Sequence, residues 1–302
     1  MVNAVIIGGI VGNILSVVGI VITNKYLTEV DGFRYMVFLS ALHFGFTMLG
    51  TRVLLRMGMF SFKHADIGAV MPVAVGSLLS VAFMNLNLQY NSVGFYQLSK
   101  LACIPFTLAV QYIAYNQHIS SKVQMCLIPI IFGVGYATVY DLDMNFVGSC
   151  FAVCAVVATS MAQIFTSTYQ KSLGCDALQL LYHTSPIILV GMIVMCPMFD
   201  DTTALAAFVY TPGCVYRILL SCCFALGVNI SNYLVLGKLG PLTYQVVGHL
   251  KTVLILVLGF VVFNKALDTR NAIGIVIAMT GVIAYSEIKR GETATPSAAL
   301  PK

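Results

Sequence analysis

The sequence contains few charged residues. Only 9% of its 302 residues are Asp, Glu, Lys or Arg, whereas 59% are hydrophobic. A soluble domain carries about 25% charged residues, so a chain of this length could not cover its surface with so few. The mean hydropathy of +0.92 agrees with this. The composition therefore excludes a soluble protein and predicts a chain that crosses a membrane many times.

Patterns typical of metal sites and of nucleic-acid binding are also missing. The nine cysteines form no C-x-x-C pair and lie mostly in apolar stretches, where a thiol behaves as a small hydrophobe. The five histidines are scattered, which argues against a metal site and a membrane enzyme. The net charge is +5, but no basic run is present. We therefore expect no enzyme, no metal, no cofactor and no nucleic-acid partner.

Apolar stretches long enough to span a bilayer recur along the whole chain, with short polar breaks between them. The first stretch lacks a basic n-region, so we expect a transmembrane helix there and not a cleaved signal peptide. The predicted helices, ten in all, cover residues 4–24, 33–55, 67–88, 92–114, 123–140, 146–168, 178–199, 215–236, 241–263 and 270–287.

An even number of spans places both termini on the same side of the membrane. Of the 16 lysines and arginines, nine fall on that side and five on the opposite side. By the positive-inside rule, the termini are expected to face the cytosol.

Two short patterns recur at the same spacing. The Tyr-Gln pair at 96–97 reappears at 244–245, and the Gly-Val pair at 133–134 reappears at 281–282, an offset of 148 in both cases. Two agreeing offsets near half the chain length indicate an internal repeat of five helices. Five is odd, so the second copy would be inverted in the membrane. Inverted repeats are typical of secondary transporters, whose substrate site lies near the midplane.

The predicted fold is therefore an all-α integral membrane protein with ten transmembrane helices in two inverted five-helix repeats. We expect one transmembrane transporter domain over residues 1–288, with repeat halves at about 1–140 and 146–288. The polar residues 289–302 are expected to form a disordered cytosolic tail.

Two lysines, Lys100 and Lys251, lie away from the predicted membrane interfaces. Lys251 has about ten mostly apolar residues on each side, roughly 15 Å of helix, so its side chain cannot reach the interface. A charge at this depth costs at least about 2.5–3.5 kcal/mol on insertion scales. No Asp or Glu falls within a predicted helix core. We expect a water-filled cavity that receives an anion; a structural lysine held by backbone carbonyls or kept neutral remains the alternative.

Other polar side chains in the predicted spans are candidates for the same cavity. Helical spacing places the candidates of 244–252 on one face and those of 96–100 on another. Such hydroxyl, amide and aromatic groups suit a ligand with ring hydroxyls and a flat base, although they also form hydrogen bonds between helices. The candidate substrate-binding residues are Lys251, Thr252, Lys100, Tyr244, Gly248, Tyr96, Gln97, Asn85, Asn229, Tyr182 and Thr184.

Three segments carry a resemblance to a known family: NSVGFYQLSKLACIPFT from residue 91, DALQLLYHTSP from 176 and GPLTYQVVGHLKTVLILVLGF from 240. They resemble the nucleotide-sugar/triose-phosphate translocator branch of the drug/metabolite transporter superfamily. Within it, the chain is similar to plant-type Golgi UDP-rhamnose/UDP-galactose and UDP-xylose transporters. The Lys251-Thr252 pair resembles the Lys-Thr signature of the nucleotide-sugar group.

The resemblance implies ten helices in a Golgi or ER membrane. It also implies antiport of a cytosolic nucleotide sugar, here a UDP-sugar, for lumenal nucleoside monophosphate (UMP). Triose-phosphate translocators have Lys-Arg where this chain has Lys251-Thr252, and a tyrosine where it has Val228. GDP-mannose transporters have Gly-Ala-Leu-Asn-Lys where it has Gly-His-Leu-Lys-Thr at 248–252.

These departures argue against a sugar-phosphate translocator and a GDP-sugar transporter, which remain the alternatives. An exporter of neutral or cationic metabolites is disfavoured by the two lysines in the membrane. The sequence leaves open which base and sugar are carried. It also leaves the oligomeric state open, a homodimer included.

Overall fold

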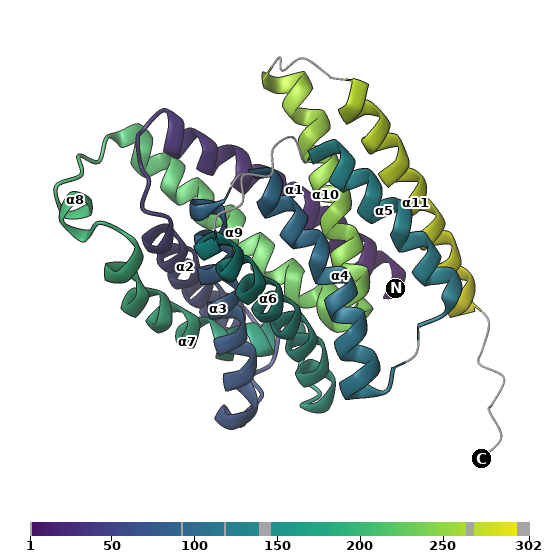
Figure 1. The fold of residues 1–302 in the computed structure, drawn as a ribbon. Coiled ribbons are helices and arrows are strands. Elements are labelled where there is room, and N and C mark those ends of the chain that lie inside the picture. The colour runs from purple at the N-terminus through teal and green to yellow at the C-terminus, as the bar shows by residue number, and fades with distance from the viewer. Residues whose placement is uncertain (1, 92, 118, 139–145, 264–268, 295–302) are drawn as a thin grey trace. The chain divides into compact units, whose positions relative to one another are not determined.

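The computed structural model describes residues 2–91, 93–117, 119–138, 146–263 and 269–294 (Figure 1). All regular secondary structure within these ranges is helical. The helices are α1 (Val2–Glu29), α2 (Met36–Arg56), α3 (Ile67–Tyr90), α4 (Val93–Tyr115), α5 (Ser121–Thr138), α6 (Phe146–Ser172), α7 (Ala177–Phe199), α8 (Thr202–Ala206), α9 (Pro212–Leu239), α10 (Pro241–Phe263) and α11 (Thr269–Ala294).

Each predicted helix has a counterpart among the described residues, and the five-residue α8 is an addition. Residue 92 and residues 139–140 of the predicted ranges lie outside the described part of the chain. Most differences lie at helix ends. For example, α9 begins at Pro212, before the predicted 215, because the Thr211 hydroxyl accepts a hydrogen bond from the Cys214 amide at 3.2 Å. Similarly, α11 continues to Ala294, beyond the predicted end at Glu287. Residues 289–294 of the expected disordered tail are therefore helical, and residues 295–302 lie outside the described part of the chain. Hydropathy locates the end of the apolar segment, whereas a helical backbone continues through polar residues.

Among the described residues, six helices are long and apolar enough to cross a bilayer by length and composition: Ile6–Glu29, Met36–Arg56, Ile67–Leu88, Phe146–Ser172, Ala177–Phe199 and Pro212–Leu239. Shorter apolar helices occupy Ser121–Tyr136 and Ala272–Ile288. These findings support a multi-pass membrane protein. The count of ten spans remains a prediction.

The chain divides into two compact units, each described here by itself. Unit 1 comprises Met1–Tyr90 and Asn145–Tyr244, and unit 2 comprises Asn91–Met144 and Gln245–Lys302. Each unit therefore takes segments from both predicted halves. The division between compact bodies does not follow the division between repeats.

Unit 1 is built on paired helices: α1 with α9, α3 with α6, and α2 with α7. Hydrogen bonds between side chains cross these pairs. The Asn13 amide nitrogen of α1 donates to Ser231 Oγ at 2.8 Å and to Asn232 Oδ1 at 2.7 Å, both on α9. The hydroxyls of Ser80 and Thr159 join α3 to α6 at 2.7 Å. Such bonds between helices stabilise a bundle in lipid, where the hydrophobic effect does not hold helices together.

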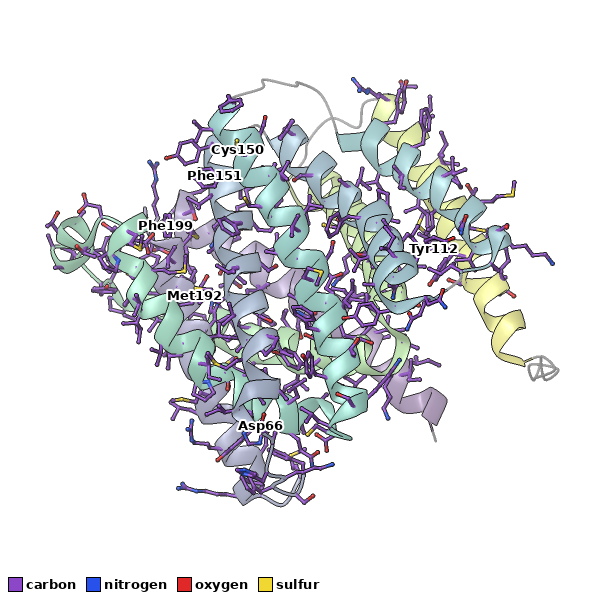
Figure 2. The ribbon with its side chains drawn as sticks, turned by 60° about the horizontal axis from the view of Figure 1, so that its bottom comes forward. Asp66, Tyr112, Cys150, Phe151, Met192 and Phe199 are labelled. Atoms are coloured by element: carbon purple, nitrogen blue, oxygen red, sulfur yellow. The ribbon has the colours of Figure 1, made fainter. Side chains whose placement is uncertain are left out.

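Apolar side chains fill the space between the same pairs. Met192 of α7 is 1% exposed and packs in a cluster with residues of α2 and α3. Phe151 of α6 lies beside α3, with ring centroids 6.5 Å from Phe83 and 5.3 Å from Tyr90. Figure 2 labels Met192 and Phe151 on their helices. Polar contacts and close packing together fix the helix pairs of unit 1.

In unit 2, α5 and α11 pack side by side (Figure 1). Their backbones approach closely at two glycines. A Cβ at Gly133 would lie 2.4 Å from the Ala278 amide nitrogen, and a Cβ at Gly281 would lie 2.9 Å from the Ile130 amide nitrogen. Real Cβ atoms are not found so close to backbone atoms. Glycine at both positions therefore permits this packing.

Candidate functional site

Two buried basic side chains lie two residues apart in α10. Lys251 is 6% exposed and His249 is 7% exposed. Lys100 of α4 is only partly buried, and it lies near enough for its charge to act on both. Unit 2 therefore gathers three basic groups from two helices, and burial makes charge on such groups costly without compensation.

A buried hydrogen bond explains how α4 and α10 bring these groups together. Gln245 Nε2 donates to Thr107 Oγ1 at 2.7 Å. This bond joins the second turn of α10 to the middle part of α4. Lys100 lies about two turns before Thr107, and Lys251 lies nearly two turns after Gln245. The two helices therefore run in opposite directions here, and this crossing places Lys100 near Lys251.

The first turns of α4 hold two further candidates, Tyr96 and Gln97. The Lys100 ammonium lies 5.0 Å from the centroid of the Tyr96 ring, within the range of a cation–π contact. Tyr96 and Lys100 therefore share a helix face, as their spacing predicts. The Gln97 side chain lies outside the described part of the structure.

Gly248 opens a space on α10 one turn before Lys251. A Cβ built on Gly248 meets no other atom within 4 Å. The Thr252 hydroxyl, on the next turn, donates to the Gly248 carbonyl at 3.3 Å. A small residue and a hydroxyl thus flank the buried lysine, and the helix surface at Gly248 leaves room for a ligand.

Two other candidates, Tyr244 and Asn229, belong to unit 1. The Tyr244 hydroxyl donates to Asn232 Oδ1 at 3.0 Å, and the same oxygen accepts from Asn13. Asn229 Nδ2 donates to the Thr47 hydroxyl at 2.9 Å. Both side chains therefore take part in hydrogen bonds between helices. This is the role that polar groups in membrane helices often have.

The remaining candidates are also in unit 1. Thr184 is fully buried, and its hydroxyl lies 2.9 Å from the Tyr233 hydroxyl. Tyr182 lies near the start of α7, where its ring meets Phe62 at a centroid distance of 5.8 Å. Asn85 is partly exposed on α3. Unit 2 thus brings together Tyr96, Lys100 and Lys251, whereas Tyr244, Asn229 and Thr184 of unit 1 bond to other helices.

His249 is the member of the basic cluster that the sequence reasoning missed. Among scattered histidines it carried no metal-site or catalytic spacing. The available signal was its place two residues before Lys251, in the same apolar run. Only the crossing of α4 and α10 shows that Lys100 is also a neighbour.

Comparison with solved structures supports the fold. One structure, titled "Crystal structure of protein", matches with a TM-score of 0.75 and covers 96% of this chain and 99% of its own. Sequence identity is only 11%, so this likeness concerns the fold alone.

Similar sequences come from Arabidopsis thaliana. UDP-xylose transporter 3 is 41% identical over 283 residues, which are 93% of this chain and 79% of that protein. UDP-rhamnose/UDP-galactose transporter 1 is 34% identical over 294 residues, which are 94% of this chain and 85% of that protein. The model of the Triose-phosphate Transporter family matches residues 13–286. With a family match over most of its length and relatives of this identity, the chain belongs to the triose-phosphate transporter family.

Proposed function

We propose that the protein is an antiporter that exchanges a cytosolic UDP-sugar for lumenal UMP by alternating access. UDP-galactose, UDP-rhamnose and UDP-xylose are the proposed sugars, because relatives with these names are similar over most of the chain. The observation that carries the proposal is the buried basic cluster of unit 2, with Lys251 at its centre. Such a cluster favours an anionic ligand over a neutral or cationic metabolite.

In this mechanism, Lys251 and Lys100 bind the phosphates of the substrate. Attraction between charges is stronger at a buried site than in water. A nucleotide sugar carries about −2, and a monophosphate with a second pKa near 6 carries about −1.5 to −2 at pH 7. Exchange of one for the other is then nearly electroneutral. An empty site leaves two cations repelling each other, which opposes closure without an anion and makes the exchange obligatory.

The proposed inverted repeat has support in the packing of α5 against α11. Gly133 meets Gly274 and Ala278, while Gly281 meets Cys126 and Ile130. Adding 148 to 126, 130 and 133 gives 274, 278 and 281. The two contact sets are therefore each other's image under the sequence repeat. Reciprocal contacts of this kind are what a local twofold axis produces. The partners run in opposite directions, as two inverted copies would.

The pairing in unit 1 supports the same repeat. The proposed symmetry relates α1 to α6, α2 to α7, and α3 to α9. It therefore exchanges the α1–α9 pair with the α6–α3 pair and maps the α2–α7 pair onto itself, and all three pairs are observed. The proposed symmetry therefore maps the helices of each compact unit onto helices of the same unit. We therefore propose that the bodies that move in alternating access are these units and not the two halves of the sequence.

The proposed location is the Golgi membrane, with both termini in the cytosol. The basis is the positive-inside bias of the loops and the resemblance to Golgi transporters. A homodimer remains a prediction that the mass of the purified protein in detergent would decide.

A sugar-phosphate translocator is the second candidate. It would need strong binding of a small phosphate dianion. The residue after Lys251 is a threonine whose hydroxyl bonds to the Gly248 carbonyl. It adds no second charge beside the lysine, which favours a larger ligand bound also through its base and sugar.

The test is counterflow exchange in liposomes that contain purified protein. Vesicles are preloaded with UMP, GMP, CMP or inorganic phosphate and then offered labelled UDP-sugars, GDP-mannose or triose phosphate. Wild type is compared with Lys251→Ala. The control is Lys238→Ala, since Lys238 is exposed in the last turn of α9.

We expect UMP to drive uptake of a UDP-sugar. Uptake should fall at least tenfold in Lys251→Ala and remain unchanged in Lys238→Ala. Uptake driven by inorganic phosphate would favour the translocator, and uptake driven by GMP would favour a GDP-sugar. Equal uptake into vesicles without internal nucleotide would contradict obligatory exchange.

A further inference from the structure

His249 is a buried base that the proposed exchange does not yet use. Its ring is 7% exposed. No hydrogen bond to this ring is present among the residues that the structure describes. A neutral imidazole has one N–H donor and one acceptor nitrogen. The ring nitrogens therefore have hydrogen-bonding capacity to offer a ligand.

The surroundings of His249 favour an anion as its partner. The charges that act on the ring come from Lys100 on α4 and Lys251 on α10. The Tyr96 ring lies under the Lys100 ammonium. The sequence ranges of α4, α5 and α10 contain no Asp or Glu. The acidic residues of α11 are Glu287 and Glu292, near its C-terminal end. No carboxylate of these helices is thus placed to neutralise the cluster.

Open space also adjoins the residue that precedes His249 in α10. Gly248, the preceding residue, faces space in which a Cβ would meet nothing within 4 Å. A phosphate that reaches Lys251 through this space would come within reach of several donors at once. Lysine supplies a point charge, whereas imidazole supplies a directed N–H bond.

We propose that His249 is a third phosphate-binding residue, which is neutral in the empty site and takes up one proton when the anion binds. This inference rests on the proposed function and deepens it. Three positive charges at one buried place repel one another strongly, so the empty site holds two. Two negative phosphate charges remove that repulsion and make a charged imidazole favourable. The proton comes from water and returns to water when the anion leaves.

One consequence is that the affinity for a UDP-sugar depends on pH through a group of the protein and not through the ligand. A UDP-sugar has no phosphate group that titrates between about pH 5.5 and 8.5, whereas imidazole titrates within this range. If one proton binds with the ligand, affinity for the UDP-sugar falls as pH rises, by up to about tenfold per pH unit. Proton uptake by Lys251 would give the same slope, so the comparison with a variant of His249 is needed to assign the proton.

The test is binding of UDP-xylose, UDP-rhamnose and UDP-galactose to the purified full-length protein between pH 5.5 and 8.5. Wild type is compared with His249→Gln, which keeps an N–H donor but cannot take up a proton. The matched control is His183→Gln: this histidine also lies on a helix, but its ring lies 2.8 Å from the Lys63 carbonyl. Thermal unfolding checks that each variant is folded.

We expect wild type and His183→Gln to lose affinity as pH rises, and His249→Gln to show a flat profile. A slope that persists in folded His249→Gln would overturn the proposal, because another group would then take up the proton. If no UDP-sugar binds, or Lys251→Ala binds as wild type does, the proposed function fails and not this inference alone.

A second measurement needs no variant. Calorimetric titration of wild type in two buffers of different ionisation enthalpy gives the number of protons taken up per UDP-sugar bound. We expect a value approaching one near neutral pH. A value of zero at every pH from 5.5 to 8.5 would contradict the proposal, whether or not His249→Gln folds.

Discussion

The two units bury different kinds of polar group. In unit 1 several of these groups are neutral and bonded to one another across helices. Besides the Asn13 contacts, His43 Nε2 lies 2.8 Å from Ser221 Oγ, and that hydroxyl donates to Asn24 Oδ1 at 2.5 Å. This chain of contacts joins α2, α9 and α1. In unit 2 the deepest polar groups include Lys251 and His249, which are basic.

The difference teaches how one chain combines rigidity with binding. Bonded amides and hydroxyls hold helices of unit 1 in register and leave little capacity for a ligand. Basic groups gathered at one place in unit 2 are costly in lipid and become favourable when an anion arrives. We infer that unit 1 serves mainly as scaffold and that unit 2 supplies the phosphate site. The predictions below test this division.

The largest expected effect is on the glycine contact that forms unit 2. In Gly133→Ala, the added carbon would lie 2.4 Å from the Ala278 amide nitrogen, so two helix backbones must separate. Overpacking costs about 1–3 kcal/mol and more where backbone must move. We expect loss of folded protein or a clear drop in melting temperature in detergent. Gly248→Ala is the control, because its Cβ meets nothing within 4 Å. Equal melting of the two variants would show that the close approach is absent.

The second prediction concerns the open space beside Lys251. Gly248→Leu should leave the protein folded, because the space at this position is open, but fill the region where the ligand reaches the lysine. We expect UDP-sugar uptake to fall at least tenfold, about 1.4 kcal/mol in binding terms. Gly12→Leu in unit 1 is the matched control, since a Cβ there also meets nothing within 4 Å. Normal uptake by folded Gly248→Leu would place the substrate elsewhere.

The sequence predicted the helices and the lysines because their signals are local. An apolar run of about 20 residues predicts a span, and a lysine in its middle is visible at once. Whether a polar residue binds a ligand or another helix is not local. Asn229 and Thr184 were selected as candidate ligand groups, yet they contact Thr47 and Tyr233.

Tertiary contacts explain why the sequence did not identify His249 as part of the basic cluster. The proximity of His249 to Lys100 depends on the crossing of α4 and α10, which brings the lysine within electrostatic range of the ring. No sequence spacing shows that crossing. The compact units were likewise not predictable from the repeat, because each unit takes helices from both halves.

A smaller effect is expected from breaking the bonded network of unit 1. Asn13 is fully buried and donates two hydrogen bonds to α9. Hydrogen bonds between membrane helices contribute about 0.6 kcal/mol each on average, with a maximum near 1.7. Asn13→Leu should therefore lower the free energy of unfolding by about 1–2 kcal/mol. The control is Leu15→Ala, at a position that is 66% exposed. If both variants unfold alike in mild denaturing detergent, the network does not stabilise unit 1.

The smallest effect is local and depends on pH. Asp201 caps α8: its side chain accepts hydrogen bonds from the Thr203 hydroxyl at 2.6 Å and from the Ala204 amide at 3.0 Å, and these bonds lower the pKa of the carboxyl group. A lowered pKa means that the stabilisation is present above the ordinary carboxyl value of about 3.9 and is lost as pH falls through the folded value. Hydrogen exchange of residues 200–207, corrected for intrinsic rates, should show less protection at pH 3 than at pH 6. Asp201→Asn keeps an acceptor without a titratable group, so its protection should be the same at both pH values. A pH-dependent loss of protection in Asp201→Asn would assign the effect to another group, and the capping carboxylate would then not control the order of α8.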